Sequence, residues 1–235
     1  MLKVLENAVP VACWSCSVAH NESTLFCPDC SKIQPPTGGD YFSVFGLEPR
    51  LNLDLAALEL EFHRLSRRLH PDRYARATDN EKQWSLADTA LVNDAYRTLK
   101  NPLRRTEYLL KLVGAETNGS ATVSRAGESA SKKQRKTPAD LLEEVFDLNM
   151  QIEEMRMAKK SGKDDPQLRE SLRAAREKFE GMVGAVDRDL RTQWAIWDAG
   201  DEGVRRPAER AMVALLDRRR YLSNLVRDVN EILGD

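Results

Sequence analysis

The stretch DLAALELEFHRLSRRLHPD, residues 54–72, decides the fold of this chain. Its apolar residues recur at steps of three and four, which places them on one face of a helix predicted over Asp54–Leu69, and its arginines fall on another face. Pro71 has no amide hydrogen and disfavours helical geometry in the residue before it, so the helix is predicted to end near His70. His70 and Asp72 are therefore expected at an exposed helix end beside a basic stripe. The apolar residues are Leu55, Leu58, Phe62, Leu65 and Leu69, and the arginines are Arg64, Arg67 and Arg68.

A second helix is predicted to begin near Asn80 and to carry its own apolar stripe, at Val92, Ala95, Tyr96 and Leu99. The two stripes can pack together, which predicts an antiparallel helical hairpin. If the His-Pro-Asp tripeptide at 70–72 were the only feature, it could be explained as a simple end of the helix beside solvated arginines. That explanation does not account for the stripes, the short segment at 40–47 and the Asn-Pro pair at 101–102 together. With these features the sequence resembles a J domain.

The resemblance implies a co-chaperone. In J-domain proteins the tripeptide and the basic face of the preceding helix engage an ATP-loaded DnaK-type heat-shock chaperone and stimulate its ATP hydrolysis. A basic patch steers the encounter with an acidic partner more than it adds affinity. The histidine is not expected to act as an acid or a base. Carried over by position, the chaperone-binding residues are His70, Pro71, Asp72, Arg64, Arg67, Arg68 and Arg73.

Length and composition restrict the number of domains and the class of protein to which the chain can belong. The 235 residues suggest one to three compact units, and 36 Lys and Arg residues against 37 Asp and Glu residues leave a formal net charge of -1. This balance argues against a general nucleic-acid binder, whose domain would be strongly basic. No apolar run approaches the ~20 residues that span a bilayer, so no membrane association is predicted. Residues 1–11 contain no secretory-type apolar stretch and are too short to identify as a transit peptide.

All four cysteines lie within the first thirty residues, as two Cys-x2-Cys pairs separated by ten residues. Each pair can direct two thiolates at one point, and two pairs complete the tetrahedral site that structural zinc prefers. About thirty residues cannot bury enough apolar surface to fold alone, so metal binding is expected to supply the folding free energy. The predicted ligands are Cys13, Cys16, Cys27 and Cys30.

Zinc is the metal predicted for this module, residues 1–36, which is expected to resemble a zinc ribbon. Tetrahedral thiolate sites also accept iron, and two disulfides would suit a secreted chain, so these are the alternatives. Four cysteines already close the site, so His20 is expected to be a loop residue. Trp14 and Phe26 are expected to cover the Cys pairs.

Two segments of the sequence separate compact units. Residues 34–39, Gln-Pro-Pro-Thr-Gly-Gly, are typical of a linker, and the J domain is predicted over 40–113. Residues 116–136 are rich in Gly, Ser, Thr, Ala and Lys without a periodic apolar residue, so 114–137 is predicted to be a flexible linker. Its basic run at 132–136 would suit nucleic acid, but such runs are more often simply solvated.

The C-terminal segment, residues 138–235, is predicted to be helical. A Thr-Pro pair at 137–138 and an Asp-Pro pair at 165–166 each place a capping residue before a proline suited to the first turn, which marks two helix starts. A third helix is predicted from about 204 to 233. Three helices joined by short turns should form an antiparallel bundle. The predicted fold class is therefore all-α: a small tetracysteine module, a J domain built from a helical hairpin with short flanking helices, and a three-helix bundle.

The first bundle helix has an apolar row that its core stripe does not explain. Leu142, Phe146 and Met150 are displaced by about 100°, the rotation per residue, from the core stripe. The row is either a broader core face or an exposed surface for a partner protein. Its acidic neighbours suit a partner with basic residues. The core stripe contains Leu141, Val145, Leu148, Ile152 and Met155, and the acidic neighbours are Glu143, Asp147 and Glu154.

The order of these parts is similar to that of the eukaryotic HscB/Jac-type J proteins of iron-sulfur cluster assembly. Three runs carry the likeness: DYFSVFGL at 40–47, NPLRRTEYLL at 101–110 and RYLSNL at 220–225. In that family the bundle binds the IscU-type scaffold on which the cluster is built. By position, the resemblance implies scaffold contacts at Leu141, Leu142, Phe146, Asp147 and Tyr221.

The sequence therefore predicts a non-enzymatic adaptor that brings a scaffold protein to its chaperone. The resemblance implies the mitochondrial matrix, with the cytosol as a second location, and leaves a homodimer open. The alternatives are a J protein for other clients or another pathway, and a zinc-ribbon nucleic-acid protein that uses the Cys module and the basic run. The absence of a nucleophile motif and of a glycine-rich phosphate loop argues against an enzyme.

Overall fold

The computed structural model describes residues 11–20, 24–36, 38–115, 138–162 and 165–234. They form two compact units: the described residues of Met1–Glu116 and of Trp194–Glu209 make the first, and those of Thr117–Gln193 and Arg210–Asp235 make the second. The predicted flexible linker and its basic run lie outside the described residues, apart from Gly114 and Ala115. The predicted all-α class is confirmed, because the only strands in the described part belong to the metal module. None of the described helices is long and apolar enough to cross a bilayer.

The metal module is built from two similar turns. Strands β1 (Val11–Ala12) and β2 (Ala19–His20) pair antiparallel on either side of the first Cys pair, and an isolated bridge joins Phe26 to Ile33 around the second. The serine after each pair has a left-handed backbone, with φ 63° at Ser17 and 59° at Ser31. So little regular structure cannot hold a fold by itself, which agrees with a module that depends on its metal.

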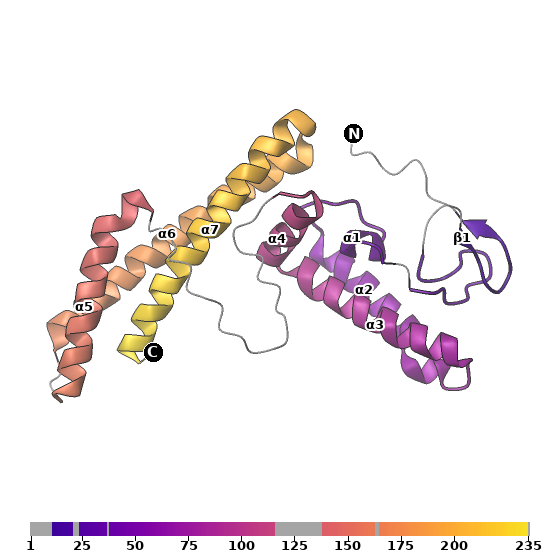
Figure 1. Ribbon diagram of the computed structural model, residues 1–235, viewed down its shortest axis with the longest axis horizontal. Coiled ribbons are helices and arrows are strands. Elements are labelled where there is room, and N and C mark those ends of the chain that lie inside the picture. Colours follow the sequence, from indigo (N-terminus) through magenta and orange to yellow (C-terminus); the bar gives the residue numbers. More distant parts are fainter. Residues whose placement is uncertain (1–10, 21–23, 37, 116–137, 163–164, 235) are drawn as a thin grey trace. The chain divides into compact units, whose positions relative to one another are not determined.

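The predicted helical hairpin is present as α2 (Leu55–Leu69) and α3 (Asp79–Lys100), which lie side by side (Figure 1). Asp54 caps α2, and Thr78 and Glu81 form a reciprocal capping box at the start of α3. The rings of Phe62 and Tyr96 stack with their centroids 4.0 Å apart. Of the predicted stripe on α2 only Leu55, in the first turn, is exposed. The buried members of the two stripes are Leu58, Leu65, Leu69, Val92, Ala95 and Leu99.

Shorter helices complete the J domain. Helix α1 (Tyr41–Val44) precedes the hairpin, the 3-10 helix η1 (Pro71–Tyr74) joins α2 to α3, and α4 (Pro102–Leu112) follows. Asn101 caps α4, and Pro102 lies in its first turn, which is the arrangement that a proline favours. The rings of Tyr41 and Tyr108 stack 4.4 Å apart and so fasten α1 to α4.

The C-terminal helices are the short 3-10 helix η2 (Ala139–Leu141), α5 (Leu142–Lys160), α6 (Pro166–Ala199) and α7 (Glu202–Leu233). The pairs Asp187–Arg219 and Arg176–Asn230 join α6 to α7, and their opposite order along the chain shows that these helices are antiparallel (Figure 1). The predicted start at Asp165 is confirmed, because its carboxylate accepts the amides of the first turn of α6. Thr137, the other predicted cap, lies outside the described residues.

The tip of the α6 and α7 pair, Trp194–Glu209, belongs to the first unit, so the predicted domain 138–235 is divided between two units. The carboxylate of Asp198 accepts three hydrogen bonds of 2.8 Å, from the Leu51 amide and from the amide and side chain of Asn52. Next to it, the fully buried Trp197 donates to Glu209 at 3.1 Å. The tip therefore fixes the segment that leads into α2.

Candidate functional site

The His-Pro-Asp tripeptide lies at the predicted place, where α2 ends and η1 begins. His70 leaves the helical region (φ -54°, ψ 128°), and its Nδ1 accepts a hydrogen bond from the Asp72 amide at 3.3 Å. The side chains of His70 and Asp72 are 59% and 91% exposed. Both side chains are therefore accessible to a partner.

Helix α3 holds the tripeptide in place. The last carbonyl groups of a helix have no partner inside that helix. The Leu69 carbonyl instead accepts the hydroxyl of Ser85 at 2.6 Å and that of Thr89 at 3.3 Å. Because Ser85 is fully buried, this bond fixes the end of α2 against α3. The sequence did not indicate these hydroxyls, because a serine and a threonine in a mainly polar helix form no pattern.

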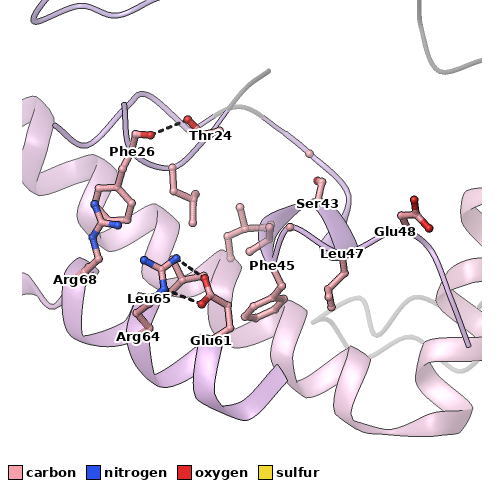
Figure 2. Close-up of a pocket in the computed structure, with 15 residues that line it drawn as sticks. Thr24, Phe26, Ser43, Phe45, Leu47, Glu48, Glu61, Arg64, Leu65 and Arg68 are labelled. Carbon is pink, nitrogen blue, oxygen red and sulfur yellow. Dashed lines mark hydrogen bonds and ion pairs between the residues drawn. The ribbon is translucent and has the colours of Figure 1, made fainter. Parts of the chain in front are cut away.

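The predicted chaperone-binding arginines have different surroundings. Arg64, Arg67 and Arg73 are exposed, whereas Arg68 is half-buried. Arg64 forms an ion pair with Glu61, in which Nε donates to Oε2 at 2.7 Å. The guanidinium of Arg68 lies over the ring of Phe26, with Cζ 3.8 Å from the ring centroid (Figure 2). The basic face of α2 is thus in contact with the metal module, which the sequence did not predict.

The four cysteines come together as predicted. Their sulfur atoms all lie within 4.8 Å of one another, with 3.6 Å between Cys13 and Cys30 and 3.7 Å between Cys16 and Cys27. A tetrahedral ion with metal–sulfur bonds of about 2.3 Å places its ligands about 3.8 Å apart. The cluster therefore fits one four-coordinate metal ion. All four cysteines are free, so the two-disulfide alternative is not supported.

Polar groups around the cluster suit thiolate charge. The amides of Ser15 and Cys30 point at the sulfurs of Cys13 and Cys27, at 3.4 and 3.5 Å. His20 is in β2 and not in a loop, so that expectation was wrong: its Nε2 is 3.3 Å from the Cys27 sulfur and 3.3 Å from an Asp29 carboxylate oxygen. A hydrogen-bond donor beside a thiolate stabilises its negative charge.

The second apolar row on α5 is exposed, which excludes the interpretation that it is a broader core face. Leu142, Phe146 and Met150 are 56%, 65% and 59% exposed. Leu141, in contrast, is 1% exposed and so lies in the core beneath the row. Met157, which was not among the residues predicted for the row, is 69% exposed and continues it along α5. The predicted acidic neighbours are all exposed: Glu143, Asp147 and Glu154.

Tyr221, the predicted contact on α7, is half-buried. One turn before it, Arg218 forms a bidentate ion pair with Asp140, at 3.1 and 2.7 Å. Hydrogen bonding to that guanidinium lowers the pKa of Asp140. The ion pair joins the turn of α7 that carries Tyr221 to the start of the exposed row.

Helix α3 contains a buried acid, Asp88, which is not among the predicted site residues. Asp88 of α3 is fully buried, and neither carboxylate oxygen has a hydrogen-bond partner in the described part of the chain. Burial raises the pKa of Asp88 to about 7. No sequence pattern indicated this, because a polar residue in a helix is normally expected on the exposed face.

Comparisons with known proteins agree with this arrangement. No protein-family model matches the sequence. The chain is 37% identical over 114 residues to the mouse iron-sulfur cluster co-chaperone protein HscB, and 40% identical over 108 residues to the human protein of the same name. These alignments cover 47% and 44% of this chain. The chain spans about half the length of the curated relatives it matches, 49% of the mouse protein and 46% of the human one.

Solved structures extend the likeness to nearly the whole chain. The crystal structure of human HscB has a TM-score of 0.62 at 26% identity, and the match covers 94% of this chain and 98% of that one. The chaperone HscB from Vibrio cholerae has a TM-score of 0.51 at 25% identity, covering 83% of this chain and 97% of that one.

Proposed function

We propose that this chain, whose sequence and fold support an HscB-type iron-sulfur co-chaperone, is an adaptor that delivers an IscU-type scaffold protein to a DnaK-type chaperone and stimulates the ATPase of that chaperone. The proposal rests on two exposed surfaces of different chemistry, one in each compact unit. One is the tripeptide at the end of a basic helix, and the other is the apolar row on α5.

The chaperone surface consists of the tripeptide and the arginines around it. His70 and Asp72 would contact the chaperone directly, and Pro71 sets the backbone that presents them. The positive charges attract an acidic partner and orient the encounter. The arginines proposed for this surface are Arg64, Arg67, Arg68 and Arg73.

The scaffold surface consists of the exposed row on α5 together with Tyr221. An exposed apolar row with acidic neighbours suits a partner that offers apolar and basic side chains. Leu142 and Phe146 would bury their side chains in the complex, Asp147 would supply charge, and Leu141 would support the row from the core. Scaffold binding of this kind needs no catalytic group.

The metal site is proposed to be structural and to hold zinc. Cys13, Cys16, Cys27 and Cys30 would fill all four positions and leave none open for a substrate. When bound, the ion would supply folding free energy to the module. Iron remains the alternative, because tetrahedral thiolates bind both metals. Metal analysis of the purified chain distinguishes them, since iron in this geometry absorbs visible light and zinc does not.

Tethering explains how such an adaptor promotes the reaction of its partner. Once the scaffold is bound to the chain, its encounter with the chaperone becomes intramolecular and depends on an effective concentration. The adaptor needs no group that acts on ATP itself. The family likeness also supports the mitochondrial matrix as the place of action, which imaging of the tagged protein tests.

Two sets of variants test the proposal. Asp72→Ala should abolish ATPase stimulation and leave scaffold affinity unchanged, because Asp72 is exposed in the other compact unit. Replacing Leu142, Phe146 and Tyr221 together by Ala should weaken scaffold binding by roughly a hundredfold or more, since each apolar contact of this kind contributes about 1 kcal/mol or more, and leave basal stimulation intact. If either change removed both activities from a folded protein, the proposal of two separate surfaces would be wrong.

A further inference from the structure

The metal module rests on the J-domain hairpin through three side chains. The guanidinium of Arg68, on α2, lies over the ring of Phe26, with Cζ 3.8 Å from the ring centroid. On α3, Lys32 pairs with Glu81, with 3.1 Å between Nζ and Oε1. Trp14 meets Trp84 edge-on, with ring centroids 5.6 Å apart. Trp14 and Phe26, which the sequence predicted as covers for the Cys pairs, therefore contact the J domain.

Arg68 is distinguished from Arg64 by its missing counter-charge. Arg64 is neutralised by Glu61, whereas Arg68 has no carboxylate partner among the described residues. A guanidinium that stacks on a ring through its face keeps the N–H donors along its edge free. Those donors are held in a fixed orientation, which favours bidentate binding of a carboxylate. Arg68 can therefore bind an anionic group of a partner protein, since no carboxylate among the described residues pairs with it.

A cavity of about 680 Å³ adjoins this arginine (Figure 2). Its walls come from the loop of the metal module that contains Phe26, from α1 and the segment after it, from α2 and from α3. The volume lies within the roughly 300–1,000 Å³ of clefts that bind small molecules, which is also room for a few side chains of a protein partner. Two carboxylates also line it, of which Glu61 is paired with Arg64 and Glu48 with Arg50. The apolar residues that line it are Leu25, Phe26, Val44, Phe45, Leu47, Leu65 and Leu91.

We infer that the metal module completes the chaperone-binding surface, and that this cavity takes a segment of the chaperone in which a carboxylate stands beside apolar side chains. The inference rests on the proposed function. The carboxylate binds Arg68, and an apolar neighbour enters the cavity. The cavity is continuous with the proposed chaperone surface, because Arg64 and Arg68 belong to both. Phe26 is a positioning residue, since it acts through Arg68.

The conservative variant Phe26→Leu tests the role of the ring. Leucine keeps the wall apolar but removes the aromatic face that holds Arg68. The chaperone concentration needed for half-maximal stimulation should rise by about threefold to tenfold, as expected when one cation–π contact is lost. Maximal stimulation, which depends on the tripeptide, should stay the same. The separate variant Phe26→Tyr keeps an aromatic face and should leave the half-maximal chaperone concentration at the wild-type value.

A double variant shows whether the effect of Phe26→Leu on chaperone affinity depends on Arg68. In an Arg68→Gln background the change Phe26→Leu should have no further effect on chaperone affinity, because the cation is already absent. An equal effect with and without Arg68 would overturn the positioning role. The matched control is Val18→Ala, which shortens an exposed apolar side chain of the same module outside the cavity and should leave the affinity unchanged.

Metal removal gives an independent readout by equilibrium binding. The chain stripped of metal by a chelator should bind the ATP-loaded chaperone about as weakly as Phe26→Leu or more weakly, while its scaffold affinity stays the same. Unchanged chaperone affinity after complete metal loss would overturn the inference. The proposed function fails separately: if Asp72→Ala still stimulated the chaperone, the function would be wrong whatever Phe26 does.

Discussion

Leu141 and Leu142 are neighbours in the sequence with opposite surroundings, 1% and 56% exposed. Leu141→Ala should lower the free energy of unfolding by about 2–5 kcal/mol, because it leaves a cavity in the core. Leu142→Ala should change it by less than about 0.5 kcal/mol but weaken scaffold binding. Urea unfolding and a binding titration of the two variants check this. Equal losses of stability would show that Leu142 is also a core residue.

The raised pKa of Asp88 predicts that the stability of the folded protein depends on pH. Its pKa is about 7 in the folded protein and near 3.8 in an unfolded chain, so the folded state holds the proton over that range and the unfolded state does not. Stability should therefore fall as the pH rises from about 4 to about 7, by at most roughly 4 kcal/mol from this group. Asp88→Asn should remove most of the difference in unfolding free energy between pH 5 and pH 8. An unchanged pH profile in the variant would show that the carboxyl titrates normally.

At the scale of single elements, much of the structure follows from local chemistry. The end of α2 at Pro71 and the start of α6 at Asp165 are where proline and capping chemistry place them. The metal ligands follow from the spacing of the cysteines. The sequence could not predict the docking of Phe26 on Arg68 or the bonds of Asp198 to residues 51–52, because periodicity identifies a face of an element and not the distant segment that covers it.

The metal module should lose its structure without the ion, because it contains only two short strands and one bridge in its described part. Chelation should therefore speed amide hydrogen exchange strongly in residues 11–36. Amides in the core of α3 serve as the internal control and should stay protected, since the hairpin has an apolar core of its own. Unchanged exchange in the module after confirmed metal loss would show that it folds without metal.

For the whole molecule, the adaptor mechanism requires both surfaces on one chain. Two proteins that each carry one intact surface cannot tether a scaffold to a chaperone. Asp72→Ala keeps the scaffold surface, and the variant with Leu142, Phe146 and Tyr221 replaced by Ala keeps the chaperone surface. The two variants therefore provide both activities in one solution without linking them.

The most direct measurement is the extra ATPase stimulation that the scaffold produces when this chain is present at a low concentration. The wild-type chain should give a large scaffold-dependent increase, because tethering raises the effective concentration of the scaffold. An equimolar mixture of the two variants should give only the basal stimulation of the variant with the intact tripeptide. A full scaffold-dependent increase from the mixture would contradict the adaptor mechanism.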